Sequence, residues 1–290
     1  MSTVEATEPA AADLSTPAIE ARNVTVRFGG LVALNDVSLA VPSASIVGLV
    51  GPNGAGKTTL FGVLSGLLHP QGGDVFLGGK KVTGASPSKR SRLGLARTFQ
   101  QLELFLGLTV REHVVLGYRV RNQRRRLWSD LFTAGALHHE SDAEKERVDH
   151  LVELLGLTTV ANTAASVLPL GTARRVEVAR ALATGPSIVL LDEPSSGLDG
   201  HETSQLGAAL RTVVDEEKVS LLLVEHDVAM VLGLSSQVAV LDFGVRIAHG
   251  TPDEIRNDPA VRAAYLGDDE AVEGTQETPP DAATEEGGEA

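Results

Sequence analysis

A glycine-rich turn near the start of the chain separates a short apolar run from a segment with helical spacing. The turn is Gly51-Pro52-Asn53-Gly54-Ala55-Gly56-Lys57-Thr58, between the apolar run 45–50 and the helical pattern 57–68. Two glycines, a lysine and a hydroxyl residue at this spacing are typical of a phosphate-binding loop. The order strand, tight loop, helix therefore predicts a P-loop NTPase of the α/β class.

Each residue type in this loop has its own task in binding phosphate. Glycines let the backbone curl so that its amides point at the β-phosphate, and the following helix adds its positive N-terminal end. Lys57 supplies a positive charge to the β- and γ-phosphates, and Thr58 offers a hydroxyl to Mg²⁺. We expect Thr59 to contact nucleotide with them. A chance glycine turn is the competing explanation, which the flanking strand and helix disfavour.

The rest of the pattern predicts how the fold is organised. Alternating apolar residues over 19–41 indicate an antiparallel β subdomain, and the pattern from 84 to about 167 is mainly helical. Strands and helices then alternate, which favours a mostly parallel core sheet. The expected helices are 110–118, 143–155, 173–183 and 203–214, and the expected strands are 188–191 and 219–224. We predict one ATPase domain over 19–266, with a helical subdomain at about 101–172.

Charge is concentrated at the two ends of the chain. The net charge is −13, yet residues 1–18 carry three acids and no base, and residues 267–290 carry nine acids and no base. Both ends are poor in large apolar side chains, so we expect disordered tails. The nearly neutral remainder has no excess of basic residues that would bind the phosphate backbone of nucleic acid.

No run approaches the roughly 18 apolar residues of a membrane span, and cysteine is absent, so a cytoplasmic location is expected.

Polar side chains follow two further apolar strands. Asp192 and Glu193 come directly after the run 188–191, and His226 follows the run 221–224. Ligands bind at the carboxyl ends of strands in open α/β sheets, so all three are expected near the phosphates. Asp192 would hold Mg²⁺, and Glu193 would orient and polarise the attacking water. A solvated acid and a structural histidine are the competing explanations.

Together these segments resemble the ATP-binding subunits of ABC transporters. Gln100, in Arg97-Thr98-Phe99-Gln100, looks like the glutamine loop, and Asp192-Glu193-Pro194 resembles the second nucleotide motif. Residues 195–199 resemble the dimer loop, and His226 the switch histidine. The resemblance covers about residues 19–266. It implies ATP and Mg²⁺ as cofactors, Glu193 and His226 as catalytic residues, and further nucleotide or metal contacts from Phe28, Gln100, Leu168, Gly171 and Asp199.

One motif departs from the family pattern. Where the family usually has Leu-Ser-Gly-Gly-Gln, this chain has Leu168-Pro169-Leu170-Gly171-Thr172. In the family this segment faces the γ-phosphate held by the opposite subunit. Pro169 has neither a hydroxyl nor an N–H group, whereas Gly171 and the helix start remain. The resemblance therefore implies weaker anion binding across the dimer, and two sites that could differ in rate.

Within the superfamily the chain looks most like the ATPases of branched-chain amino-acid importers. The residues that carry this likeness are Phe28-Gly29-Gly30-Leu31, Arg97 to Gln100 with Leu104-Phe105, Val224-Glu225-His226-Asp227, and Gly250-Thr251-Pro252 leading to Tyr265-Leu266-Gly267. The implied partners are membrane permease subunits, a second ABC ATPase subunit that is identical or different and, indirectly, a solute-binding protein. The implied location is the inner face of the cell membrane.

Three other functions remain as alternatives. Lipopolysaccharide-export ATPases share several of these residues. A soluble ABC ATPase acting on nucleic acid or ribosomes commonly has two fused domains or a long coiled-coil insertion, and neither appears here. A P-loop kinase would not explain His226.

A basic run has three possible explanations: it faces anionic lipid, it faces the membrane partner, or it is a solvated loop. The run consists of Arg119, Arg121, Arg124, Arg125 and Arg126.

Overall fold

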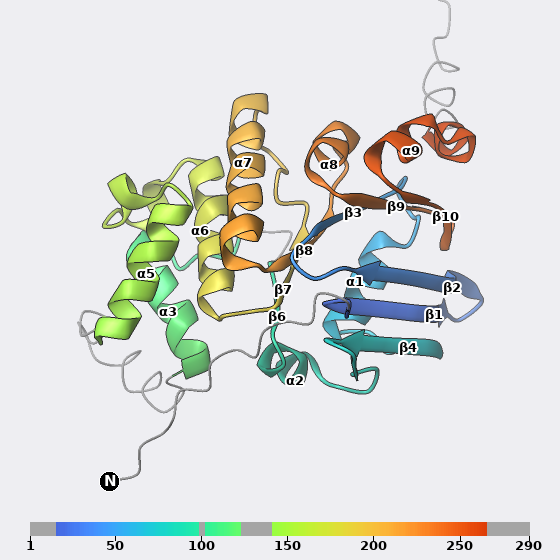
Figure 1. Ribbon diagram of the computed structural model, residues 1–290, viewed down its shortest axis with the longest axis horizontal. Coiled ribbons are helices and arrows are strands. Elements are labelled where there is room, and N and C mark those ends of the chain that lie inside the picture. Colours follow the sequence, from blue (N-terminus) through green and yellow to red (C-terminus); the bar gives the residue numbers. More distant parts are fainter. Residues whose placement is uncertain (1–15, 99–101, 123–140, 266–290) are drawn as a thin grey trace, which may run out of the picture.

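The protein is built from two sheets and a group of helices, seen in a computed structural model that describes residues 16–98, 102–122 and 141–265. In Figure 1 helices α3, α5 and α6 lie on the left and strands β1, β2 and β4 on the lower right. The helices are α1 (Lys57–Ser65), α2 (Pro87–Arg92), α3 (Val110–Asn122), α5 (Asp142–Leu154), α6 (Leu170–Ala183), α7 (Gly200–Glu217), α8 (Val228–Leu234) and α9 (Pro252–Asn257).

A six-stranded sheet forms the centre of the fold. Its order is β10-β9-β3-β8-β7-β6, and all neighbours pair in parallel except β9 and β10. Every residue of β3, β7 and β8 is buried, as expected for strands covered on both faces. The predicted α/β fold with a mostly parallel core sheet is confirmed. The strands are β3 (Ile46–Val50), β6 (Leu95–Arg97), β7 (Ile188–Asp192), β8 (Ser220–Val224), β9 (Gln237–Asp242) and β10 (Val245–Gly250).

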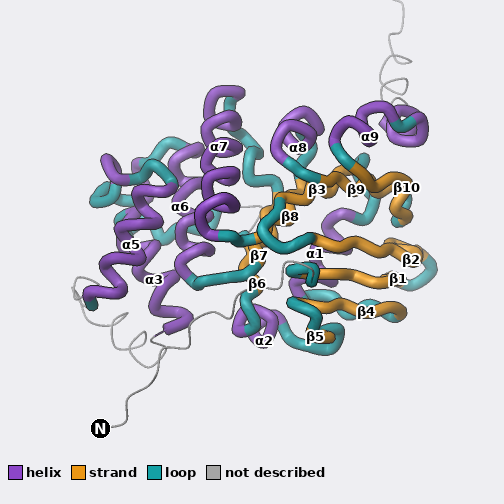
Figure 2. The backbone as a smooth tube through the Cα atoms, in the orientation of Figure 1, coloured by secondary structure: helices purple, strands orange, loops and turns teal. Residues whose placement is uncertain are grey.

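The second sheet is antiparallel and has the order β2-β1-β4-β5. Its strands are β1 (Ile19–Phe28), β2 (Leu31–Val41), β4 (Gly72–Leu77) and β5 (Lys80–Lys81). Val24 and Val26 point into the core, whereas Phe28, at the tip of the hairpin, is 50% exposed. The tube view separates the strands of both sheets from the helices beside them (Figure 2).

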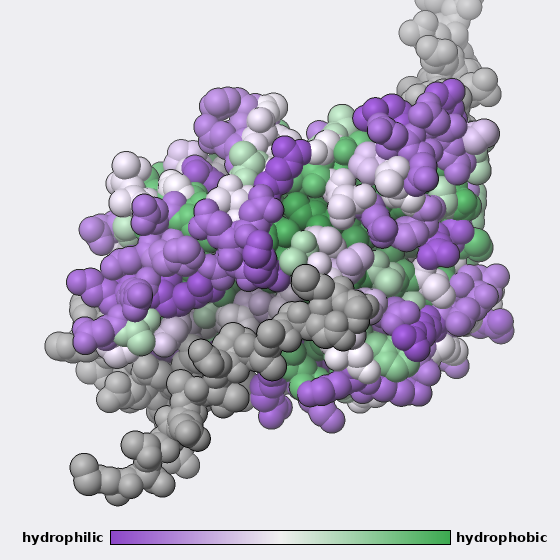
Figure 3. Space-filling model, in the orientation of Figure 1, coloured by the Kyte–Doolittle hydropathy of each residue, from purple (hydrophilic) through white to green (hydrophobic). Residues whose placement is uncertain are grey.

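Helices α3, α5 and α6 pack on one another through aliphatic side chains. Val114, Val148, Leu151 and Val176 are fully buried in this cluster, and the outer side of α5 is hydrophilic in Figure 3. A capping box starts α5, because the Ser141 hydroxyl accepts from the Glu144 backbone amide at 3.3 Å.

The basic run divides into residues with different environments. Arg119 is buried and pairs with the buried Glu144 at 2.6 Å, joining α3 to α5. Arg121 donates to the carbonyls of Thr184 and Gly185. Because Arg119 is buried and paired within the subunit, it faces neither lipid, nor the membrane partner, nor solvent, and all three interpretations are wrong for this residue. Arg124, Arg125 and Arg126 lie outside the described residues.

Several expected boundaries differ from the structure for local reasons. Residues 95–97, expected in a mainly helical region, form strand β6, which is too short to show a period. Helix α1 ends at Ser65 because Gly66 takes the left-handed conformation that terminates helices. Helix α6 begins at Leu170, directly after Pro169, and α7 begins at Gly200.

Arg90 caps the far end of the helix that follows the phosphate loop. Its guanidinium is fully buried and donates to the carbonyls of Val63 and Leu64 in α1, and of Thr83 and Ala85. Burial lowers the pKa of Arg90, but the four carbonyls and the negative end of α1 hold its charge in place.

We expect Arg90→Met to destabilise the protein by about 2–3 kcal/mol, because buried carbonyls lose their donors. Urea unfolding of the full chain measures this loss. The matched control is Arg92→Met on the exposed side of the same helix, where we expect a change within about 0.5 kcal/mol. Equal stability of the two variants would contradict the capping role.

Candidate functional site

Three parallel strands bring the expected site residues to one edge of the central sheet. β3 leads into the phosphate loop, β7 ends at Asp192, and β8 precedes Glu225 and His226. Because β3, β8 and β7 are neighbours in the sheet and run parallel, their carboxyl ends lie at the same edge. The topology therefore gathers residues that are more than 170 positions apart in the sequence.

The phosphate loop has the backbone conformation that its glycines permit. Gly51, Gly54 and Gly56 have φ values of 151°, 81° and 102°. A Cβ on Gly51 would lie 2.1 Å from the Leu241 carbonyl oxygen, so only glycine fits there. Beside Gly56, a Cβ would meet the Ala33 carbonyl at 2.8 Å, which shows that the β1–β2 hairpin lies against the loop.

Lys57 is buried inside the loop. Its ammonium donates to the carbonyls of Gly51 at 2.5 Å and Pro52 at 2.9 Å. Burial lowers the pKa of Lys57, and the negative charge of Glu193 opposes this effect. Thr58 and Asn53 are exposed beside it, and Thr59 is half-buried. The first turn of α1 thus presents hydroxyls and amides together with one buried cation.

Asp192 is buried and pairs with a residue that the sequence interpretation had not singled out. The Arg97 guanidinium donates to Asp192 Oδ2 at 3.1 Å, contacts Ser65 Oγ at 3.3 Å and lies 4.8 Å from the centre of the Phe61 ring. Burial raises the pKa of Asp192, and the charge of Arg97 opposes it. Arg97 therefore joins the end of strand β7 to helix α1, which follows the glycine-rich loop.

Glu193 and His226 form a direct pair. Glu193 Oε1 lies 2.7 Å from His226 Nε2, while 52% of the His226 side chain is exposed. Glu193 has a φ of 48°, which is uncommon for a residue with a side chain and is typical of functional sites. A carboxylate held by an imidazole can polarise an attacking water, and this pair lies at the same edge of the sheet as the glycine-rich loop.

Comparison with known proteins decides the family. A family model described as "ABC transporter" matches residues 34–196, which is more than half of the chain. The chain belongs to the ABC transporter ATPases. A second model, described as "Branched-chain amino acid ATP-binding cassette transporter", matches residues 245–271 of this ABC ATPase.

Relatives and solved structures agree with this assignment. The ABC ATPase is 39% identical to the high-affinity branched-chain amino acid transport ATP-binding protein BraF of Pseudomonas aeruginosa, over 88% of this chain and 100% of BraF. Identity to LivG of Escherichia coli K12 is 37% over the same shares. The crystal structure of an ABC-transporter ATP-binding cassette in its ADP conformation matches with a TM-score of 0.74 and 27% identity, over 87% of this chain and 99% of that one.

The remaining predicted site residues of the ABC ATPase are placed as follows. The Asp199 carboxylate accepts from the Glu202 amide at 2.8 Å and starts α7 as a capping box. The Leu168 side chain packs against the main core. Gln100 lies outside the described residues. The nucleotide, metal and catalytic roles of the predicted residues remain predictions.

Residues 168–172, which differ from the usual family sequence, make their contacts within the same subunit of the ABC ATPase. Pro169 is the N-cap of α6 and makes no side-chain cap. The Gly171 amide donates to Glu202 Oε1 at 3.3 Å, and Glu202 Oε2 accepts from the Asp199 amide at 3.3 Å. An internal carboxylate therefore already lies at the helix start, where the family resemblance expects a phosphate from the other subunit. In the sequence, the spacing of Asp199 and Glu202 is typical of a capping box. It places Glu202 at the start of α7 but does not indicate its contact with Gly171.

We expect Pro169→Ser to raise ATP turnover about three- to tenfold, since one hydroxyl would add a hydrogen bond to a charged phosphate. Steady-state phosphate release from the assembled dimer measures the change. Val167→Ser, two residues earlier on an exposed side chain, is the control and should leave turnover as it is. An unchanged rate in Pro169→Ser would argue against a weakened signature segment.

Proposed function

We propose that this ABC ATPase powers the import of branched-chain amino acids or a related solute through a separate membrane permease. The observation that carries this proposal is the similarity to BraF and LivG over the whole of those proteins and 88% of this chain, supported by the family match at residues 245–271. Within the described ranges, none of the helices combines the length and apolar character that crossing a bilayer needs. A peripheral position at the inner face of the membrane fits an ATPase that works on a separate permease.

The loop amides and Lys57 bind the β- and γ-phosphates in this proposal, and Phe28 stacks on adenine. Glu193 orients and polarises the water that attacks the γ-phosphate, while His226 holds Glu193 through the 2.7 Å contact. The exposed ring of Phe28 lies on the hairpin that packs against the loop, which supports the stacking role.

Mg²⁺ fits the donor set at this edge of the sheet. Among the described residues, no group of three or more His, Cys, Asp or Glu side chains is arranged so that it could hold a metal ion by itself. Mg²⁺ needs no such cluster, because it is usually held by one or two carboxylates, phosphates and water. Thr58 and Asp192 would hold the ion together with Gln100. When bound, it neutralises negative charge on the phosphates.

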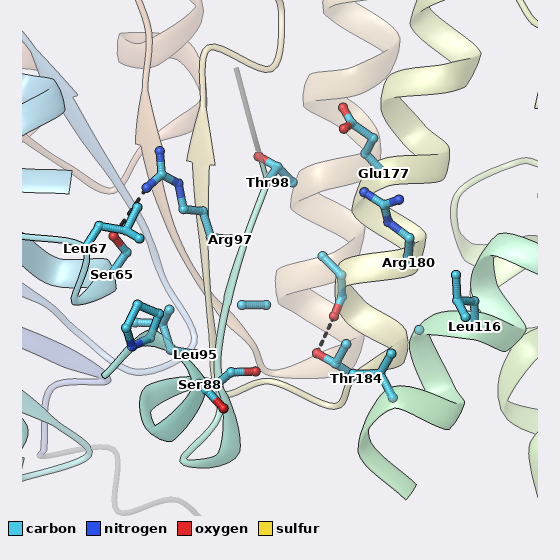
Figure 4. Close-up of a pocket in the computed structure, with 16 residues that line it drawn as sticks. Ser65, Leu67, Ser88, Leu95, Arg97, Thr98, Leu116, Glu177, Arg180 and Thr184 are labelled. Atoms are coloured by element: carbon cyan, nitrogen blue, oxygen red, sulfur yellow. Dashed lines mark hydrogen bonds between the residues drawn. The ribbon is translucent and has the colours of Figure 1, made fainter. Parts of the chain in front are cut away.

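A groove beside Arg97 is the surface that best suits the permease. The groove has a volume of about 440 Å³ and lies between α2 and β6 on one side and α3 and α6 on the other (Figure 4). Its lining is mostly apolar, from residues such as Leu67, Leu116 and Val120. The charged groups of the lining are Arg97, Glu177 and Arg180. Such a groove would bind the apolar face of an amphipathic helix, with a few polar side chains of that helix near the charged groups.

The groove also reaches the segments that flank Gln100. Arg97 and Thr98, which line it, precede Gln100. Past that residue, the Glu103 amide donates to Glu177 Oε1 at 3.1 Å, and its carbonyl accepts from Arg180 at 2.6 Å. A helix that moves in the groove would therefore shift both sides of the glutamine loop together with α6.

Dimerisation completes the proposed cycle. ATP binds between two ATPase subunits, each 168–172 segment closes on the opposite phosphate loop, and hydrolysis reopens the pair. The second subunit is either a copy of this chain or a related ATPase.

A pulldown of tagged Glu193→Gln protein from native membranes with ATP present tests the whole proposal. Co-purification of a helical permease and an ATPase partner, identified by mass spectrometry, supports it. Recovery of ribosomal or DNA-bound proteins would point to a soluble ABC ATPase. Phosphate release without any acceptor, and its loss in EDTA, separates an Mg²⁺-dependent hydrolase from a kinase.

A further inference from the structure

Glu225 is a buried acid beside the proposed catalytic pair that the mechanism above does not use. Only 3% of its surface is exposed. Burial raises the pKa of Glu225, and the nearby negative charge of Glu193 raises it further. A carboxylate is costly in such a place unless donors hold it, so its contacts indicate what it is for.

The donors come from the start of the dimer loop. The Ser195 amide donates to Glu225 Oε1 at 2.7 Å, and the Ser195 hydroxyl and the His226 amide also stabilise the charge. The loop is fixed again at its other end, where Asp199 caps α7. Between these ends, the Ser196 amide donates to the Glu193 carbonyl at 3.1 Å. The dimer loop is thus tied to Glu193 and to Glu225 at once.

Two neighbouring contacts cross-link the ends of β7 and β8. Glu193, after β7, pairs with His226, and Glu225, after β8, pairs with Ser195. The strand ends are joined as well, because the Glu193 amide donates to the Val224 carbonyl at 2.8 Å. In one contact the carboxylate belongs to the segment after β7, and in the other it belongs to the segment after β8. A shift of either segment would therefore disturb the other.

We infer that Glu225 is a positioning residue that fixes the dimer loop, residues 195–199, relative to the Glu193–His226 pair. Movement of the loop by the opposite subunit would then change the position of Glu193 directly. This inference rests on the proposed function for its consequence, because Glu193 is the proposed water-orienting group. The contact itself needs neither nucleotide nor partner.

Hydrogen exchange of the full chain without nucleotide tests the contact. We expect the Ser195 amide to exchange at least about tenfold faster in Glu225→Ala, because it loses a bond to a charged acceptor. Glu225→Gln keeps a carbonyl acceptor, so its exchange should stay within about threefold of the wild type. Glu217→Ala, which loses an ion pair to Arg147 and a hydrogen bond to His150 at the other end of α7 from the loop, is the control for general destabilisation.

Steady-state kinetics test the consequence. We expect Glu225→Ala to lower kcat about 10- to 100-fold with KM for ATP within about threefold, and Glu225→Gln to recover most of the loss. Unchanged Ser195 exchange in Glu225→Ala, or a loss confined to KM, would overturn the inference. A wild-type chain that hydrolyses no ATP would count against the proposed function, whereas the exchange result would still decide whether Glu225 holds the loop.

Discussion

Lys57→Ala is expected to lower kcat/KM for ATP by at least about 100-fold, the loss typical when one preorganised donor to a developing anion is removed. Lys57 is the buried cation of the phosphate loop, and its ammonium already lies against the Gly51 and Pro52 carbonyls. ATP affinity should fall as well, by about 10- to 100-fold, because charge-assisted hydrogen bonds are lost. Binding of a fluorescent ATP analogue and phosphate release measure the two effects.

The control for this variant removes one lysine outside the glycine-rich loop, so that the net charge changes by the same amount. Lys145 lies exposed on α5, and Lys145→Ala should bind and hydrolyse ATP like the wild type. A thermal unfolding midpoint close to that of the wild type would show that Lys57→Ala is folded. Wild-type affinity in a folded Lys57→Ala protein would be evidence that the loop does not bind nucleotide.

Glu193→Gln is expected to lower ATP turnover by about 10²- to 10⁴-fold while ATP binding is retained. The amide keeps the size of the side chain and an acceptor for His226, but it cannot take a proton from the attacking water. The effect should therefore appear in kcat with little change in KM. Single-turnover phosphate release, with ATP binding measured in parallel, separates the chemical step from binding.

Glu216→Gln, which alters an exposed carboxylate on α7, is the matched control and should behave like the wild type. ATP-dependent dimers should accumulate in Glu193→Gln, because closure still occurs but hydrolysis does not reopen the pair. Turnover within about threefold of the wild type would exclude Glu193 as the water-orienting group and would shift attention to His226.

The local order of the chain was enough to determine the class of fold and the phosphate loop. Strand, glycine turn and helix are consecutive, so the spacing of Gly51, Gly56 and Lys57 carries the whole geometry of that loop in one short segment. Apolar runs predicted β7 and β8, and with them the acids and the histidine that follow. These features depend on neighbours within a few residues, which sequence patterns record directly.

Contacts between distant segments were decided only by the tertiary structure. Strand β6 is three residues long and is held by pairing with β7 rather than by a pattern of its own. Arg97 meets Asp192, Gly171 meets Glu202, and Glu225 meets Ser195 across 95, 31 and 30 positions of sequence. Local sequence patterns do not record these pairs, because the parallel pairing of β6, β7 and β8 and the packing of α6 on α7 set which distant groups meet.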